Sequence, residues 1–278
     1  MHSFSFQRWL LLVGKHWAEN KKKYTLSVVA ILGLIIFWFV FMMLTSRYDP
    51  LSRQVQTSTY FISLFAVGCL FASQFFSQLG SKTKSIFYLL TPASALEKLL
   101  CSLFYAVLIF FIVFTAVFYL ADVVMVSVAN AVHPYYQVPD GNGVIPKAAI
   151  ANVFDGKGPG LNAVNISYYF LLLFFAVQSA FLLGSVYFSQ YSFIKTAIVL
   201  FGLFIAASFT EGYLLHTFLP EGTHHKGLTA FASMGDGRLD KVVELSPWVA
   251  QVTGFLLCYA FAPLFWMVTY FRLTEKEV

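Results

Sequence analysis

The feature that most constrains this chain is a succession of apolar blocks, each about 20 residues long or longer. A helix of that length crosses the roughly 30 Å hydrocarbon core of a bilayer. Only 11% of the 278 residues are charged, against roughly a quarter in soluble domains. The blocks therefore predict an all-α polytopic membrane protein with six transmembrane helices, at residues 24–45, 58–79, 98–130, 166–188, 193–212 and 247–270.

The residues before the first span have an amphipathic pattern. Three charged residues, Arg8, Lys15 and Glu19, lie opposite a helically spaced apolar face. We expect residues 1–23 to form a helix along the inner membrane surface, with its indoles at the headgroup level. The alternative is that this segment is only a basic flank that sets the membrane topology. Residues 24–278 are expected to form the six-span domain. The apolar face contains Phe6, Trp9, Leu10, Val13 and Trp17.

The placement of Lys and Arg predicts the orientation of the chain. With six spans, eleven of the 18 basic residues flank the spans on one side and seven lie on the other, mostly in long segments. Basic residues in short flanks mark the cytoplasmic side, so both termini are expected there, in a bacterial cytoplasmic (inner) membrane. The net charge of +5 is spread over these flanks and forms no basic surface typical of nucleic-acid binding.

Two long outer loops are expected, at about 130–165 and 211–246. The first is rich in proline and glycine, which is typical of turns, and we expect a cap or mobile loop without strands. The second contains the short apolar run Tyr213-Leu214-Leu215. This run is too short to span, so it is expected to re-enter the membrane or lie at the outer surface.

The segment between spans two and three, residues 80–98, is the most informative for function. Gly80 is suited to end a helix, whereas Thr91 and Pro92 are suited to begin one, as N-cap and first helical residue. Between these signals lies the apolar run Ile86-Phe87-Tyr88-Leu89-Leu90, which would be costly to expose to water. Either lipid or another protein is expected to cover it.

This segment and the chain's end, Tyr270-Phe271-Arg272-Leu273-Thr274-Glu275-Lys276, resemble bacterial ABC-2-type transporter permease subunits. The resemblance implies a half-transporter that pairs with a second copy or homologue of itself and rests on a separate cytoplasmic ATP-binding subunit. That subunit would hold the ATP and Mg, and this chain would bind no cofactor. The resemblance places the contact with the ATPase in the first cytoplasmic loop, at Lys82, Lys84, Ser85, Ile86, Phe87, Tyr88, Leu89, Leu90, Glu97 and Lys98.

Polar side chains inside the spans are further candidates, because burying them in lipid is expensive. They either bond neighbouring helices and interfacial water or line a seam between two subunits. Small residues spaced four apart in spans four and five permit close helix approach, within one chain or between subunits. The polar candidates are Gln74, Gln78, Asp122, Gln178, Glu211 and Gln251, and the small residues are Ala176, Ala180, Gly184, Gly202, Ala206 and Thr210.

The sequence contains no phosphate-binding loop and no metalloprotease or serine-hydrolase motif. Its histidines are scattered, so we expect no metal site and no catalysis by this chain alone. The hypothesis is a permease subunit that moves a hydrophobic or amphipathic solute. The alternatives are a non-transporting scaffold for envelope assembly, an intramembrane enzyme, which would need convergent catalytic groups, and a secondary carrier, which would need an inverted repeat.

Overall fold

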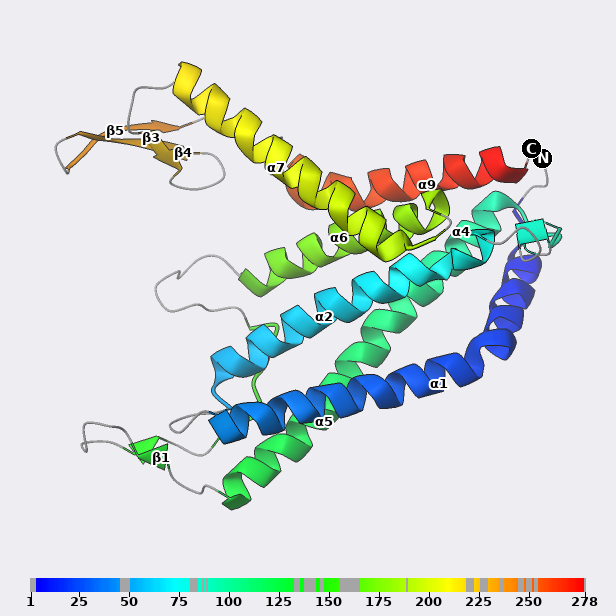
Figure 1. Ribbon diagram of the computed structural model, residues 1–278, viewed down its shortest axis with the longest axis horizontal. Helices are drawn as coiled ribbons and strands as arrows, with labels where there is room; N and C mark the ends of the chain where they lie inside the picture. Colours follow the sequence, from blue (N-terminus) through cyan, green and yellow to red (C-terminus); the bar gives the residue numbers. More distant parts are fainter. Residues whose placement is uncertain are drawn as a thin grey trace.

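The structure is a computed structural model of the whole chain, and it confirms a molecule built mainly of long apolar helices (Figure 1). It describes residues 4–45, 51–80, 85–86, 88, 90–132, 136–137, 144–145, 148–155, 166–188, 190–218, 223–225, 230–235, 238–244, 248, 252 and 255–277.

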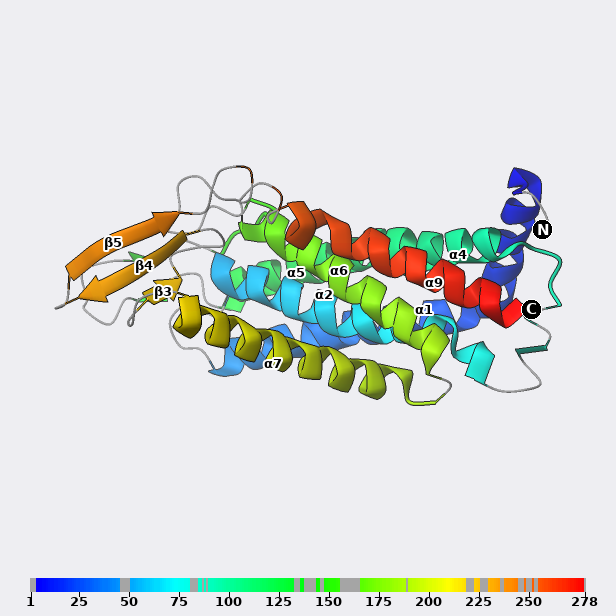
Figure 2. The ribbon, with the colours of Figure 1, turned by 90° about the horizontal axis from the view of Figure 1, so that it is seen from above.

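The chain begins with α1 (Phe6–Thr45), a continuous helix of 40 residues. At 1.5 Å per residue it is about 60 Å long, twice the thickness of the hydrocarbon core. Its first turns bend away from the remainder and lie across one end of the helical bundle (Figures 1 and 2). The predicted surface helix and the predicted first span therefore belong to one bent helix.

The remaining helices run back and forth along the bundle. The predicted third span is one helical stretch in three parts, because a π-helical turn, η2, separates α4 from α5. A second π-helical turn, η3, precedes α9. The bounds are α2 (Arg53–Phe75), α4 (Ala95–Leu103), η2 (Phe104–Ile109), α5 (Phe110–Val132), α6 (Ile166–Tyr187), α7 (Ser192–Phe218), η3 (Leu256–Ala260) and α9 (Phe261–Glu277).

Among the described residues, five helical stretches are long and apolar enough to cross a membrane. They coincide with the first five predicted spans. The sixth predicted span, 247–270, lies partly outside the described residues, and α9 has 17 residues, so a sixth crossing stays a prediction. The five stretches are Phe6–Thr45, Arg53–Phe75, Ala95–Val132, Ile166–Tyr187 and Ser192–Thr210.

Helix α6 occupies the middle of the bundle and packs against α2, α7 and α9, whereas α1 packs against α5 and α4. A β-carbon added to Gly184 of α6 would lie 2.9 Å from the Thr196 β-carbon of α7, so glycine permits this close approach. A β-carbon added to Gly202 of α7 would meet no atom of the described residues within 4 Å. Gly184 thus serves packing within the chain, whereas Gly202 makes no such close contact with the described residues.

Both chain termini lie at the same end of the bundle, here called the terminal end (Figures 1 and 2). Short strands lie near the opposite end, called the loop end. There β1 (Tyr136–Gln137) pairs antiparallel with β2 (Val144–Ile145). Strands β3 (Thr223–His225), β4 (Ala230–Gly235) and β5 (Arg238–Glu244) form an antiparallel sheet.

One expectation about the outer loops was wrong, and another was not tested. The loop at 130–165 contains the two-stranded ladder β1–β2, because its glycine-rich Asp140–Gly143 stretch separates two short segments that can pair. The run Tyr213-Leu214-Leu215 continues α7, which ends at Phe218. Its place at the outer surface or in the membrane stays a prediction.

Candidate functional site

The segment that joins α2 to α4 at the terminal end, residues 76–94, is called the connector. Gly80 was expected to end the second span, but α2 ends at Phe75 with Phe76 as its C-cap, and Gly80 instead ends a separate 3-10 turn, η1 (Ser77–Gly80). The other end of the connector also differs from the prediction. The N-cap of α4 is Ser94, not Thr91, and the first helical residue is Ala95, not Pro92.

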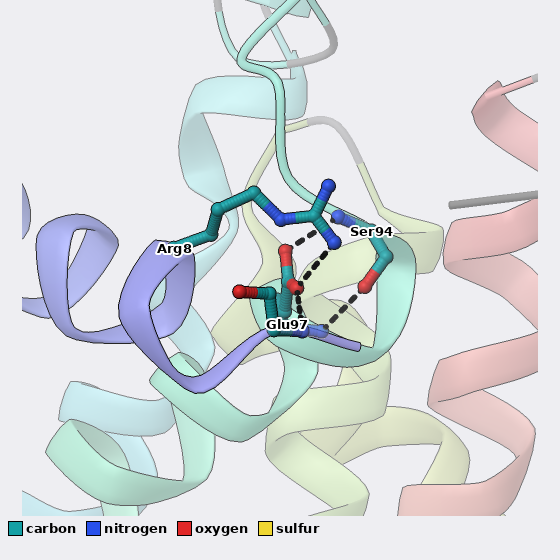
Figure 3. Close-up of polar contacts among 4 residues, drawn as sticks. Arg8, Ser94 and Glu97 are labelled. Carbon is teal, nitrogen blue, oxygen red and sulfur yellow. Dashed lines mark hydrogen bonds and ion pairs between the residues drawn. The ribbon is translucent and has the colours of Figure 1, made fainter. Parts of the chain in front are cut away.

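A capping box explains this later start of α4. The Glu97 backbone N–H donates to the Ser94 hydroxyl at 3.3 Å, and the Ser94 backbone N–H donates to the Glu97 carboxylate at 2.9 Å (Figure 3). This reciprocal pair satisfies two backbone donors that a helix start otherwise leaves open. The spacing Ser-x-x-Glu is visible in the sequence, so this signal could have placed the cap correctly.

The Glu97 carboxylate also binds the beginning of α1. It is fully buried, and its Oε1 accepts hydrogen bonds from the Ser5 backbone N–H at 2.8 Å and from the Arg8 guanidinium at 3.0 Å. The Arg8 side chain is 35% exposed. One carboxylate thus joins the first turn of α1, the end of the connector and the first turn of α4 (Figure 3), and we call these four residues the Glu97 clamp.

Aromatic contacts strengthen this attachment of α1. The Trp9 ring packs edge-on against Phe104, with ring centroids 5.7 Å apart. Farther along, the Tyr105 hydroxyl donates to the Val13 carbonyl at 2.9 Å. The predicted surface helix is therefore held against α4 and η2 by its own side chains as well as by any contact with headgroups.

The apolar run of the connector is only partly exposed. Ile86 is 56% exposed and Leu90 is 73% exposed. Tyr88, which was expected to be exposed with them, is half-buried and packs edge-on against Phe76. The Lys98 ammonium lies 5.4 Å from the Tyr88 ring centroid, and Lys98 is almost completely buried. Ser85 is half-buried, and the predictions for Lys82, Lys84, Phe87 and Leu89 lie outside the described residues.

A cavity of about 250 Å³ lies between α1, the end of α2 and the start of α4. A smaller one of about 50 Å³ adjoins it and shares His16, Phe75 and Gln78 with it. Two predicted polar residues are found here, since Gln78 lines both cavities and Gln74 lines the smaller. The larger cavity is lined by Leu12, Lys15, His16, Glu19, Phe75, Gln78, Tyr88, Thr91, Lys98 and Cys101.

The other predicted polar residues do not join this group. Asp122 of α5 is fully buried, and neither of its carboxylate oxygens has a hydrogen-bond partner among the described residues. Gln178 of α6 is buried and donates to the Ala106 carbonyl at 2.5 Å, which is a bond between helices. Glu211 lies in α7, but its side chain and the whole of Gln251 are outside the described residues.

At the terminal end the last helix is also attached to its neighbours. The Lys276 ammonium of α9 donates to the Val186 carbonyl at the end of α6, at 2.6 Å. Burial, with a contribution from nearby Arg272, lowers the pKa of Lys276. The motif near the chain's end thus forms the last turns of a helix that caps the neighbouring helix end.

The chemistry of a metal centre is not assembled in the described part of the chain, where no three His, Cys, Asp or Glu side chains come together. Comparisons of the chain with protein-family models, with curated proteins and with solved structures each gave no match. The resemblance to ABC-2-type permeases therefore rests on the two short motifs, and function has to be argued from the geometry of the terminal end.

Proposed function

We propose that this chain is the six-span permease subunit of an ATP-binding-cassette-type transporter. A separate cytoplasmic ATP-binding subunit drives it, and the cargo is a hydrophobic or amphipathic solute. Two copies, or this chain and a homologue, form the transmembrane part in the inner membrane, with their terminal ends facing the cytoplasm. The ATPase holds the nucleotide and Mg, in keeping with the lack of a phosphate-binding loop in this sequence.

The observation that carries the proposal is the combination of an exposed apolar connector with the Glu97 clamp. Ile86 and Leu90 present apolar surface that the described parts of the chain leave uncovered, and such surface in water favours a protein partner. The connector leads directly into Ser94, which is bonded to Glu97 and through it to Arg8. A displacement of the connector would therefore reach α1 and α4 together.

This arrangement suits a mechanism in which the ATPase works by pushing. Closure of two ATP-binding subunits would move the connector, and the clamp would transmit the movement to the first turns of α1 and of α4. Because α4 continues through η2 into α5, the movement would tilt one side of the bundle relative to α6 and its neighbours. Such a tilt exposes a path for the solute to one side of the membrane and then to the other.

The test is co-purification of the full-length chain with an ATP-binding protein encoded by the same cells. Ile86→Asp and Leu90→Asp place a charge on the exposed side chains, and Lys21→Asp is the control, because Lys21 is also exposed but lies outside the connector. We expect the two connector variants to lose the ATPase and the control to retain it. Retention by both connector variants would count decisively against the proposal.

A non-transporting scaffold is the second candidate, and the three-stranded sheet at the loop end favours it. Strands β3–β5 extend beyond α7 (Figures 1 and 2) and offer a surface to an envelope partner. Reconstituted vesicles separate the two functions. ATPase stimulation together with solute movement supports the permease, whereas stimulation without movement of any amphipathic probe supports the scaffold.

A further inference from the structure

The two polar cavities at the terminal end carry an excess of positive charge. Their described charged lining consists of Lys15, Lys23, Lys98 and Glu19. Lys15 lies 3.9 Å from Glu19 and 3.5 Å from the Thr91 hydroxyl, so its ammonium stands at the rim between α1 and the connector. Lys98 is the buried cation on the opposite wall. Three ammonium groups against one carboxylate leave a site that attracts anions.

The polar cavities adjoin a third cavity of different character. It has a volume of about 380 Å³, lies between α1 and α5, and is lined almost entirely by apolar side chains. Tyr24 and Phe71 line both this cavity and the smaller polar one. The Tyr24 hydroxyl is hydrogen-bonded to His16 at 2.5 Å. The polar lining of the two smaller cavities therefore ends at Tyr24, where the apolar lining of the third cavity starts.

These cavities lie where the predicted spans place the boundary between headgroups and acyl chains. Along α1 the polar pair is lined by residues 12–24, beside Lys21-Lys22-Lys23 at the start of the predicted first span, and it meets the last part of the predicted second span at Gln74 and Gln78. The apolar cavity is lined by Val28, Ile31 and other residues deeper in the first span. Trp17 is the residue nearest the N-terminus that lines the apolar cavity, and indole side chains favour the boundary between headgroups and acyl chains. Basic pockets between membrane helices on the cytoplasmic side bind anionic headgroups.

We infer that the two polar cavities bind the phosphate group of an anionic amphiphile, and that the third cavity holds its acyl chain between α1 and α5. Lys15, Lys23 and Lys98 attract the phosphate, and Gln74 and Gln78 supply amide donors beside it. The inference requires no nucleotide and no ATPase, so it can fail or succeed independently of the proposed function.

The test is native mass spectrometry of the purified full-length protein, titrated with dioleoyl phosphatidylglycerol or with dioleoyl phosphatidylcholine. We expect the anionic lipid to bind about tenfold more tightly or better, because each lysine near the headgroup favours an anion. Lys15→Glu should lower that affinity about tenfold. Lys22→Glu is the matched control, because Lys22 is exposed on the same helix and lines none of the three cavities. Equal effects of the two variants would overturn the inference.

Two further measurements separate a lipid from a free phosphate ion. Inorganic phosphate should displace the lipid only at concentrations far above the lipid's own Kd, and displacement at equal concentration would overturn the assignment to an amphiphile. Val28→Trp, which fills the apolar cavity, should weaken lipid binding, whereas Leu26→Trp should not, because Leu26 is 71% exposed and lies outside it. Unchanged binding in Val28→Trp would remove the acyl-chain site.

Discussion

Replacing Glu97 by glutamine tests whether one carboxylate holds the first turns of α1 in place. In the native chain, Oε1 accepts from the Ser5 N–H and the Arg8 guanidinium, and Oε2 accepts from the Ser94 N–H. Glutamine can keep an oxygen where Oε1 stands, but it then places an amide NH₂ where Oε2 stood. That group is a donor facing the Ser94 donor, so the capping bond is lost and the charge is removed from the other two.

The expected cost follows from these three bonds. Loss of a helix cap costs about 1 kcal/mol, and replacing a charged acceptor by a neutral one costs about 1 kcal/mol for each remaining bond. Arg8 is 35% exposed and Ser5 precedes the helix, so both can regain bonds to water, and we halve their share. The capping bond lies between the connector and α4, so its loss destabilises the start of α4 and not the attachment of α1. Detachment of the first turns of α1 should therefore become easier by about 1 kcal/mol, which is roughly a fivefold change in the equilibrium.

Hydrogen exchange followed by mass spectrometry measures this detachment in the intact, detergent-solubilised protein. Amides of residues 6–23 should exchange up to about fivefold faster in Glu97→Gln, while those of α6 should not change. Glu275→Gln is the matched control, since Glu275 pairs with Arg272 at 2.5 Å but is 61% exposed, and exposed pairs contribute at most about 1 kcal/mol. If exchange in residues 6–23 is the same in Glu97→Gln and in the native protein, the clamp does not hold α1.

Three other substitutions test the inside of the bundle, with thermal unfolding in detergent as the measurement. Gly184→Ala should destabilise the protein by about 1–3 kcal/mol through overpacking against Thr196. Gly202→Ala should be neutral or stabilise by up to about 1 kcal/mol, because its site is open among the described residues and alanine favours helix. Equal losses of stability in the two variants would refute the packing role of Gly184. Asp122→Asn should keep or raise the stability, because neither carboxylate oxygen has a described partner to lose. A loss of more than about 1 kcal/mol in Asp122→Asn would reveal a bond to that carboxylate.

Membrane thickness and helix length made most of the helices predictable. An apolar block near 20 residues has few other stable forms, so five blocks became five helical stretches within about five residues of the expected bounds, except that the first begins at Phe6 instead of residue 24. The segments without that constraint were predicted less well. In the loop at 130–165, turn residues indicated where the chain reverses but not that Tyr136 and Gln137 pair with Val144 and Ile145. Strand pairing depends on register, which such short segments encode weakly.

The candidate site was predictable only in its local part. The capping box at Ser94 and Glu97 lies within four residues and could have been found by its spacing. The bond from Arg8 to Glu97 joins residues 89 positions apart, and it exists because α1 bends across the end of the bundle. Arg8 was assigned to the polar side of a surface helix, a location that contains no information about a partner. The burial of Asp122 was hidden for another reason, since a helix that is apolar on all sides does not reveal which face is inside.

The clamp and the cavities meet in a single turn of α4. Glu97 binds the first turn of α1, whereas its neighbour Lys98 lies on the wall of the larger polar cavity beside Tyr88 of the connector. If an ATPase displaces the connector, Tyr88 and Lys98 move with it and the anion site changes shape. Binding free energies are reciprocal, so an ATPase that weakens the binding of an anionic amphiphile must itself be bound less tightly when the amphiphile is present, and by the same factor. The proposed function and the proposed lipid site therefore form one coupled system if both are correct, and the factor measured from either side must agree.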